Sequence, residues 1–152
     1  MEEEVYQMGV NGGNEMTGNY EHSLDSAGRI IVPSKLREKL GPVFYVAPGS
    51  KENLTMYPLE TWERLKARVS ELGTADAEDM DAFFGFAQRC ETDKQWRFIL
   101  SSDLKEYAGI DRDVVISGNN DRAQIWNKTN WAAKRSKVTP ANIADLMRRL
   151  KV

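Results

Sequence analysis

The chain has 152 residues, 41% of them hydrophobic and four of them tryptophan, which suits one domain or two small ones sharing a core and excludes a disordered protein. No apolar run approaches the roughly 20 residues that span a bilayer, and the acidic start has no segment of signal-peptide length, so we expect a cytosolic protein. The net charge of −2 argues weakly against a nucleic-acid partner, but residues 1–15 hold four acids and no base, while residues 22–41 hold four bases and two acids. A local basic surface is therefore compatible with the total charge.

The first half of the chain predicts a short extended segment, a short helix, a hairpin and a longer helix. β-Branched residues dominate positions 30–32, and residues 34–40 predict a helix that ends at Gly41, a residue typical of helix C-termini. Strands are expected at 44–47 and 54–57, on either side of a turn at 49–50. The helix predicted at 59–72 carries a core-facing stripe at helical spacing: Trp62, Leu65, Val69 and Leu72.

The second half repeats this order after a linker. Residues 74–89 are acidic and then apolar, which predicts a linker helix that packs on the core. Strands are expected at 114–116 and 123–126 around a turn at 118–120, and a helix begins near Thr129. Thr139 and Pro140 predict the start of a last helix, with Thr as its cap and Pro at its first position. That helix continues into Ile143, Leu146, Met147 and Leu150.

The two halves are copies of one module. The stretch LDSAGRIIVP at residues 24–33 and the stretch TDKQWRFILS at residues 92–101 both place Asp four positions before Arg, and both continue with three bulky apolar residues. Asp25 aligns with Asp93, and Arg29 with Arg97, in a register that holds for about twenty residues. Short strands leave edges that must be paired. We therefore expect the two modules to pair with each other in a small α+β barrel of pseudo-twofold symmetry.

The stretch MTGNYEHSLDSAGRIIVPSKLREKL at residues 16–40, with YPLETW and IWNKTNW after the two hairpins, resembles the MraZ family over residues 16–152. This resemblance implies an α+β fold of tandem AbrB-like modules that form a swapped-hairpin, pseudo-twofold β-barrel with flanking helices. On this basis we divide the chain into a disordered or extended tail at 1–15, a first module at 16–73, a linker helix at 74–89, and a second module with a C-terminal helix at 90–152.

The resemblance also implies a function. MraZ proteins are bacterial transcriptional regulators of the division and cell-wall gene cluster in which they are encoded. They assemble into rings and bind short G-rich direct repeats in a promoter. The resemblance thus implies a cytoplasmic, nucleoid-associated homo-oligomer whose partner is double-stranded promoter DNA, with no cofactor, membrane or small-molecule substrate.

The family signature D-x-x-G-R matches Asp25, Gly28 and Arg29. Glycine takes a positive φ at little steric cost, so the loop can turn and let Arg29 project, while Asp25 bonds the turn or holds the guanidinium. A guanidinium held in this way can bond guanine O6 and N7. From spacing alone, a loop salt bridge of little energetic value is the better interpretation; the resemblance favours DNA. Phosphate contacts are expected from three residues of the following helix: Lys35, Arg37 and Lys39.

The second signature departs from the family because Trp96 stands where glycine is expected. A bulky side chain disfavours a positive φ. Either this loop turns differently or Trp96 packs against a neighbour. Arg97 remains a candidate for DNA contact, and the first loop is the stronger of the two.

An enzyme is not expected. His22 is the only histidine and Cys90 the only cysteine, so the sequence offers no His pair for a metal and no second histidine base. We expect no metal, a structural role for His22, and a buried Cys90. A second basic group at residues 134–151 is interpreted as solvated or in contact between subunits, with DNA contact as the less favoured alternative. The alternative function is an oligomeric protein-interaction scaffold whose DNA binding is incidental.

Overall fold

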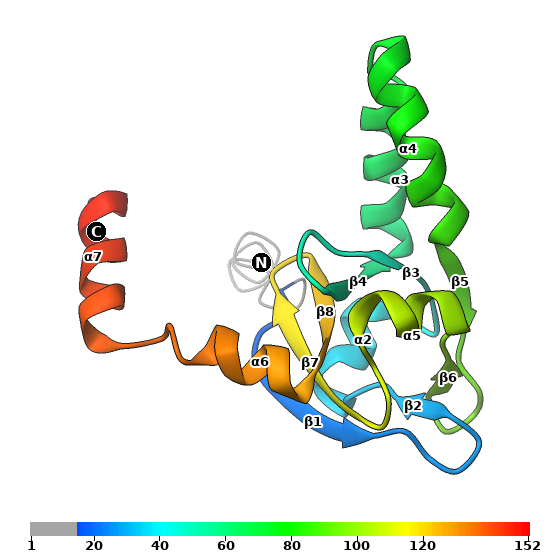
Figure 1. Cartoon of the computed structure of the whole chain (residues 1–152), viewed down its shortest axis with the longest axis horizontal. Helices are drawn as coiled ribbons and strands as arrows, with labels where there is room; N and C mark the ends of the chain where they lie inside the picture. The colour runs from blue at the N-terminus through cyan, green and yellow to red at the C-terminus, as the bar shows by residue number, and fades with distance from the viewer. Residues whose placement is uncertain (1–14) are drawn as a thin grey trace, which may run out of the picture.

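The computed structural model describes residues 15–152, which form eight strands, six α-helices and one short 3₁₀ helix (Figure 1). The first half contains β1 (Asn19–Ser23), β2 (Arg29–Ile31), the 3₁₀ helix η2 (Ser34–Leu36), α2 (Arg37–Leu40), β3 (Val43–Pro48), β4 (Asn53–Pro58) and α3 (Leu59–Val69). The second half contains α4 (Thr74–Phe86), β5 (Gln88–Glu91), β6 (Arg97–Ile99), α5 (Ser102–Ala108), β7 (Asp113–Asn119), β8 (Arg122–Asn127), α6 (Lys128–Arg135) and α7 (Pro140–Leu150).

Strands from the two halves pair with each other in both sheets. The main sheet has the order β1-β7-β8-β4-β3-β5, and β2 pairs with β6 in a separate two-stranded sheet. Strand β1 of the first half lies beside the hairpin β7–β8, while β5 of the second half lies beside the hairpin β3–β4. The two hairpins meet where β4 pairs with β8. The result is a mixed α+β fold with antiparallel pairing, in which each half completes the sheet of the other.

Short-range signals set the helix ends that the sequence predicted. Gly41 ends α2 with φ 78°, and its N–H donates to the carbonyl of Arg37 over 2.8 Å. Thr139 caps α7, because its hydroxyl accepts a hydrogen bond of 3.2 Å from the backbone N–H of Asn142. Both ends are confirmed. The helix predicted over 34–40 is instead one 3₁₀ turn followed by one α-helical turn.

One large hydrophobic core joins the two halves. The rings of Phe44 from β3 and Phe98 from β6 meet edge to face with centroids 5.1 Å apart. Ile30 of β2 is also fully buried, so both strands of the small sheet are anchored in this core. Burying one such side chain contributes about 1.5–3 kcal/mol. The core therefore holds rigidly the two strands into which the Asp-x-x-x-Arg loops lead.

Helices α3 and α4 form an antiparallel pair that projects from the main sheet (Figure 1), and residues 59–86 are called the arm below. At the base of the arm, the ring of Trp62 stacks on Tyr45 at 4.6 Å and meets Phe84 edge to face at 5.7 Å. Farther out, Val69 is half-buried and Leu72 is 42% exposed. The prediction that Leu72 faces the core is wrong, because the arm has left the sheet before that residue.

The linker helix predicted at 74–89 is present as α4 and ends earlier, at Phe86. Gln88 and Arg89 instead pair with Val46 and Tyr45 as part of β5. Sheet pairing therefore overrides the helical continuation. The tail predicted at 1–15 lies outside the described residues apart from Glu15. Over residues 15–152, every helix is too short or too polar to traverse a bilayer.

Candidate nucleic-acid interface

The first candidate loop is a tight turn organised by one carboxylate. The N–H of Gly28 donates to the carbonyl of Asp25 over 2.9 Å, and Gly28 has φ 77°. Oδ1 of Asp25 accepts hydrogen bonds from the backbone N–H groups of Ala27 (2.9 Å) and Arg29 (2.8 Å), while Oδ2 accepts from Nε of Arg29 at 2.7 Å. The roles expected of Asp25 and Gly28 in shaping the turn are both present.

This network lowers the pKa of Asp25, chiefly through the hydrogen bond from the backbone N–H of Arg29. The carboxylate is therefore ionised at neutral pH, and it fixes the guanidinium through a charge-assisted contact. The pair is only partly shielded, with 35% of the Arg29 side chain and 34% of the Asp25 side chain exposed. Within the described residues, the two terminal nitrogens of Arg29 have no hydrogen-bond partner and remain able to donate.

The second loop reproduces the first bond for bond. Oδ1 of Asp93 accepts from the backbone N–H groups of Gln95 (2.8 Å) and Arg97 (2.9 Å), and Oδ2 accepts from Nε of Arg97 at 2.8 Å. The pKa of Asp93 is lowered, chiefly by the backbone N–H of Arg97. The backbone N–H of Trp96 donates to the carbonyl of Asp93 over 3.0 Å, and Trp96 has φ 63°, close to the value at Gly28. The loop keeps the same turn in spite of its tryptophan.

Trp96 therefore follows the second of the two expected alternatives and packs against neighbours. Its ring is half-buried against the main core, and the guanidinium carbon of Arg37 lies 5.5 Å from the ring centroid. Its carbonyl accepts the N–H of Val32 over 2.8 Å, which ties the second loop to the first half of the chain. These contacts hold a bulky residue in a conformation that costs it about 1–2 kcal/mol.

The pairing of β2 with β6 brings the two loops onto one surface. In this antiparallel register Arg29 lies opposite Ile99, and Arg97 lies opposite Ile31. A groove of about 470 Å³ is lined by Arg29 and Arg97, and also by Arg89 from β5. Three guanidinium groups on one groove form a surface suited to phosphate oxygens and guanine edges.

Arg89 was not among the residues chosen from the sequence. It lies on a short polar strand whose pairing partner, β3, is more than forty positions away along the chain. Its guanidinium forms an ion pair of 3.0 Å with Glu91, so part of its charge is already balanced. No local pattern marks this position, and only the pairing of β5 with β3 brings it to the groove.

The three basic residues after the first loop differ in how freely they can reach a ligand. Lys35 is exposed and Lys39 is half-buried. Arg37 is more constrained, because its Nε donates to the carbonyl of Val32 over 2.9 Å while its guanidinium covers Trp96. Arg37 thus joins the second loop to the segment that follows β2, and it keeps only part of its guanidinium for a phosphate.

The two remaining chemically distinctive residues are Cys90 and His22. Cys90 is buried, as predicted, and burial raises the pKa of its thiol to about 12. His22 is half-buried, and its pKa is lowered by that burial and by the charge of Arg37. Among residues 15–152, His, Cys, Asp and Glu side chains form no group of three that could hold a metal ion.

Fold and site together define a class: a duplicated α+β protein whose two equivalent loops each present an arginine fixed by an aspartate. The family described as "MraZ protein, putative antitoxin-like" matches the chain twice in tandem, over residues 16–82 and 83–151. The chain belongs to the MraZ family.

Curated relatives cover most of the chain. A protein of Acetivibrio thermocellus named "Transcriptional regulator MraZ" is 42% identical over 118 residues, which is 75% of this chain and 82% of the relative. A protein of the same name from Heliobacterium modesticaldum is 38% identical over 82% of this chain and 89% of its own length. Another, from Caldanaerobacter subterraneus subsp. tengcongensis, is 36% identical over 89% of this chain and 96% of the relative.

Proposed function

We propose that this protein is a transcriptional regulator that binds double-stranded DNA through its Asp-x-x-x-Arg loops. The observation that carries the proposal is the pair of equivalent turns that fix Arg29 and Arg97 through Nε and direct both arginines to one groove. A guanidinium positioned in this way loses less conformational entropy on binding than a free side chain. The relatives named as transcriptional regulators support the same function.

The family resemblance extends the proposal to the target and the assembly. We infer that the protein binds short G-rich direct repeats in the promoter of its own division and cell-wall gene cluster, in the nucleoid, as a ring-shaped homo-oligomer of AbrB-like swapped-hairpin barrels. Direct repeats about 10 bp apart present the same groove face at each helical turn. Repeated subunits then add weak contacts through effective concentration.

The first loop carries the larger share of binding in this proposal. Both loops have the same backbone, so glycine alone does not distinguish them. The surrounding charges do: Lys35 and Lys39 follow the first loop, whereas the helix after the second loop offers Lys105 between Asp103 and Glu106. The bases of the helix that follows Arg29 favour phosphate contacts, and the acids of the helix that follows Arg97 oppose them.

The test is fluorescence anisotropy on a duplex that carries the repeats upstream of the chain's own gene. Arg29→Ala should weaken binding by about 1–3 kcal/mol per engaged site and relax the preference for guanine. Arg97→Ala should cost less. Arg68→Ala is the matched control, because Arg68 is an exposed arginine on the arm and away from the groove.

A salt titration supplies the second readout. The logarithm of the binding constant should fall linearly with the logarithm of the salt concentration, with a slope that reports several phosphates. Absence of binding at low salt would refute the function. Equal affinity for the repeat duplex and a scrambled duplex would favour the alternative, an interaction scaffold with incidental DNA binding. Equal losses for Arg29→Ala and Arg97→Ala would refute only the ranking of the loops.

A further inference from the structure

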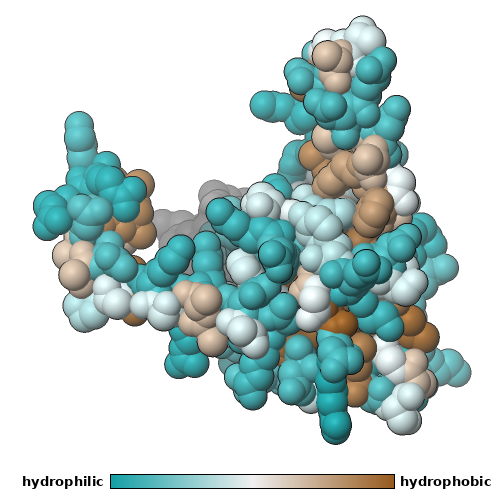
Figure 2. Space-filling view, viewed as in Figure 1, coloured by the Kyte–Doolittle hydropathy of each residue, from teal (hydrophilic) through white to brown (hydrophobic). Residues whose placement is uncertain are grey.

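Helix α7 carries an apolar face that nothing in its own chain buries among the described residues. Ile143, Met147 and Leu150 are 41%, 38% and 59% exposed, and they lie with Leu146 on one face at helical spacing. No residue of α7 is buried. Figure 2 shows hydrophobic residues on the side of α7 that faces the body of the molecule. An isolated helix of this length is marginal in water, so the face fits a partner surface.

The same segment is strongly basic. Residues 134–152, called the basic tail here, contain six bases and a single acid, Asp145. Asp145 pairs with Arg148 and Arg149 at 3.2 and 3.1 Å, and both arginines remain largely exposed. The bases are Lys134, Arg135, Lys137, Arg148, Arg149 and Lys151.

The arm at residues 59–86 offers the opposite charge together with apolar surface. It contains seven acids and three bases, and α4 by itself contains four acids and no base. Leu72 and Phe86 are 42% and 40% exposed, and no residue of α4 is buried. An acidic surface with half-exposed apolar residues is complementary to a basic helix with an apolar face.

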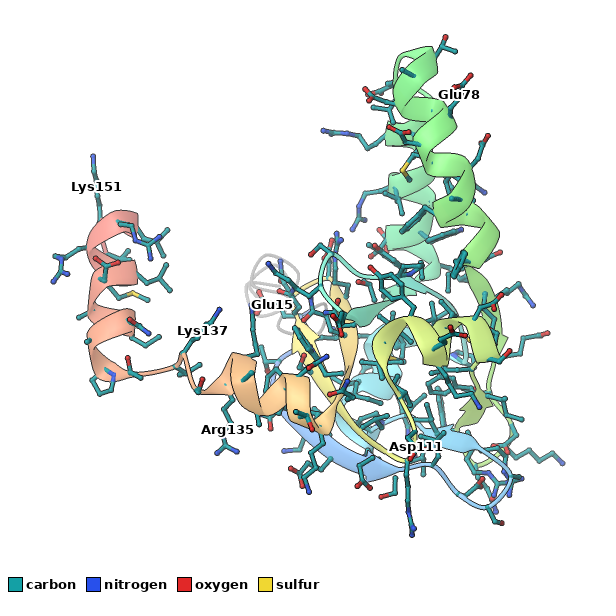
Figure 3. All side chains as sticks on the ribbon, in the orientation of Figure 1. Glu15, Glu78, Asp111, Arg135, Lys137 and Lys151 are labelled. Carbon is teal, nitrogen blue, oxygen red and sulfur yellow. The ribbon has the colours of Figure 1, made fainter. Side chains whose placement is uncertain are left out.

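Within one molecule these two surfaces lie far apart. The basic tail extends from one side of the main sheet, and the arm projects from the other side (Figure 1). In Figure 3, Lys137 and Lys151 on the tail and Glu78 near the end of the arm lie on opposite sides of the molecule. Contact between the surfaces therefore requires a second copy of the chain.

We propose that the basic tail of one copy docks on the acidic arm of a neighbouring copy, with the apolar face of α7 against the half-exposed apolar residues of the arm. This interface rests on the self-association included in the proposed function, and it names the surfaces that make it. The contact joins two different surfaces, so it is heterologous, and repetition of such a contact closes into a ring or continues as a filament. DNA is a poor occupant for this site, because a phosphate backbone satisfies the bases and leaves the apolar face in water.

The first experiment removes the apolar contact and keeps the helix. The full-length double variant Ile143→Gln/Met147→Gln retains residues of good helix propensity. Ala141→Gln is the matched control on the opposite face of α7. Light scattering at micromolar concentration, without DNA, should show the wild type and the control as oligomers and the double variant at the monomer mass of 17.3 kDa. Thermal unfolding followed by circular dichroism checks that each variant folds.

The second experiment tests the pairing of charges. Asp76→Lys/Glu78→Lys/Asp79→Lys/Asp81→Lys reverses the four exposed acids of α4, and Lys137→Glu/Arg148→Glu/Arg149→Glu/Lys151→Glu reverses four exposed bases of the tail. Each variant alone should lose assembly. Mixed in equal amounts the two should assemble again, because each reversed tail then meets a reversed arm and each unchanged tail meets an unchanged arm.

The outcomes separate this interface from the wider proposal. An oligomeric Ile143→Gln/Met147→Gln variant, or a mixture of charge variants that stays monomeric, would overturn the docking and leave self-association intact. A monomeric wild type would overturn both, while the anisotropy measurements judge DNA binding independently. The same variants can be mixed with vesicles of anionic lipid. If Ile143→Gln/Met147→Gln keeps the oligomer mass of the wild type but binds the vesicles less well, the apolar face belongs to a membrane contact instead.

Discussion

Replacing Trp96 by alanine and by glycine separates the packing of the ring from the strain of the backbone. A fully buried tryptophan cut back to alanine costs about 3–5 kcal/mol, so the half-buried ring of Trp96 accounts for about half of that. Loss of the Arg37 contact adds about 0.5–1 kcal/mol. We expect Trp96→Ala to lower the free energy of unfolding by about 2–3.5 kcal/mol on these terms.

Trp96→Gly should be less harmful than Trp96→Ala. Glycine relieves the left-handed strain that any Cβ suffers at φ 63°, which is worth about 1–2 kcal/mol. Because glycine has greater conformational freedom in the unfolded chain, this gain in stability is reduced by about 0.5–1 kcal/mol. The glycine variant should therefore be the more stable of the two by about 0.5–1 kcal/mol.

Urea unfolding followed by circular dichroism measures both variants, at one protein concentration because self-association shifts apparent stability. An alanine variant as stable as the glycine variant would refute the reasoning, since residue 96 would then have no left-handed strain to relieve. A wild type less stable than both variants would refute the stabilisation that we assign to packing of the Trp96 ring.

Two further predictions test the first loop and its surroundings. Gly28→Ala should lower the free energy of unfolding by about 0.5–1 kcal/mol, through backbone strain alone, because a Cβ there meets nothing within 4 Å; a loss of several kcal/mol in urea unfolding would show an unrecognised contact. His22 has a lowered pKa in the folded state, so the unfolded chain binds the proton more readily, and stability present at neutral pH should be lost as the pH falls below about 6.5. His22→Gln should flatten that decline in thermal midpoints measured between pH 7 and 5, and an unchanged slope would contradict the assignment.

Much of the fold was predictable because its signals are local. The hairpin strands β3, β4, β7 and β8 combine apolar runs with turn residues, and the caps at Gly41 and Thr139 depend on neighbours a few positions away. Strands β1 and β5 were not predicted. Both are short and largely polar, and each exists because it pairs with a hairpin of the other half. Long-range pairing of this kind leaves no periodic trace in a single strand.

In the candidate site, too, local contacts were predictable from the sequence and contacts between the two halves were not. The sequence predicted that Asp25 would bond the turn or hold the guanidinium of Arg29, a contact that spans four positions, and it left open whether the loop before Arg97 turns in the same way. It did not predict that Arg89 lines the same groove or that Arg37 is held against Trp96, because both depend on how the halves are paired. Local sequence fixes how each arginine is held, and tertiary pairing fixes which charges share a surface.

The contact between Trp96 and Arg37 changes how the duplicated loops are unequal. At the offset that aligns the two loops, Lys105 corresponds to Arg37 and Gly28 to Trp96. A guanidinium stacks on an aromatic face, which a lysine ammonium does less well, so the arginine at position 37 suits the ring of Trp96. At Gly28 the space beside the backbone stays open, whereas at Trp96 the ring and Arg37 fill it. The two loops therefore share one backbone and one carboxylate network, and they differ in access: a ligand can approach the backbone of the first loop closely, while the second loop serves in part to join the two halves.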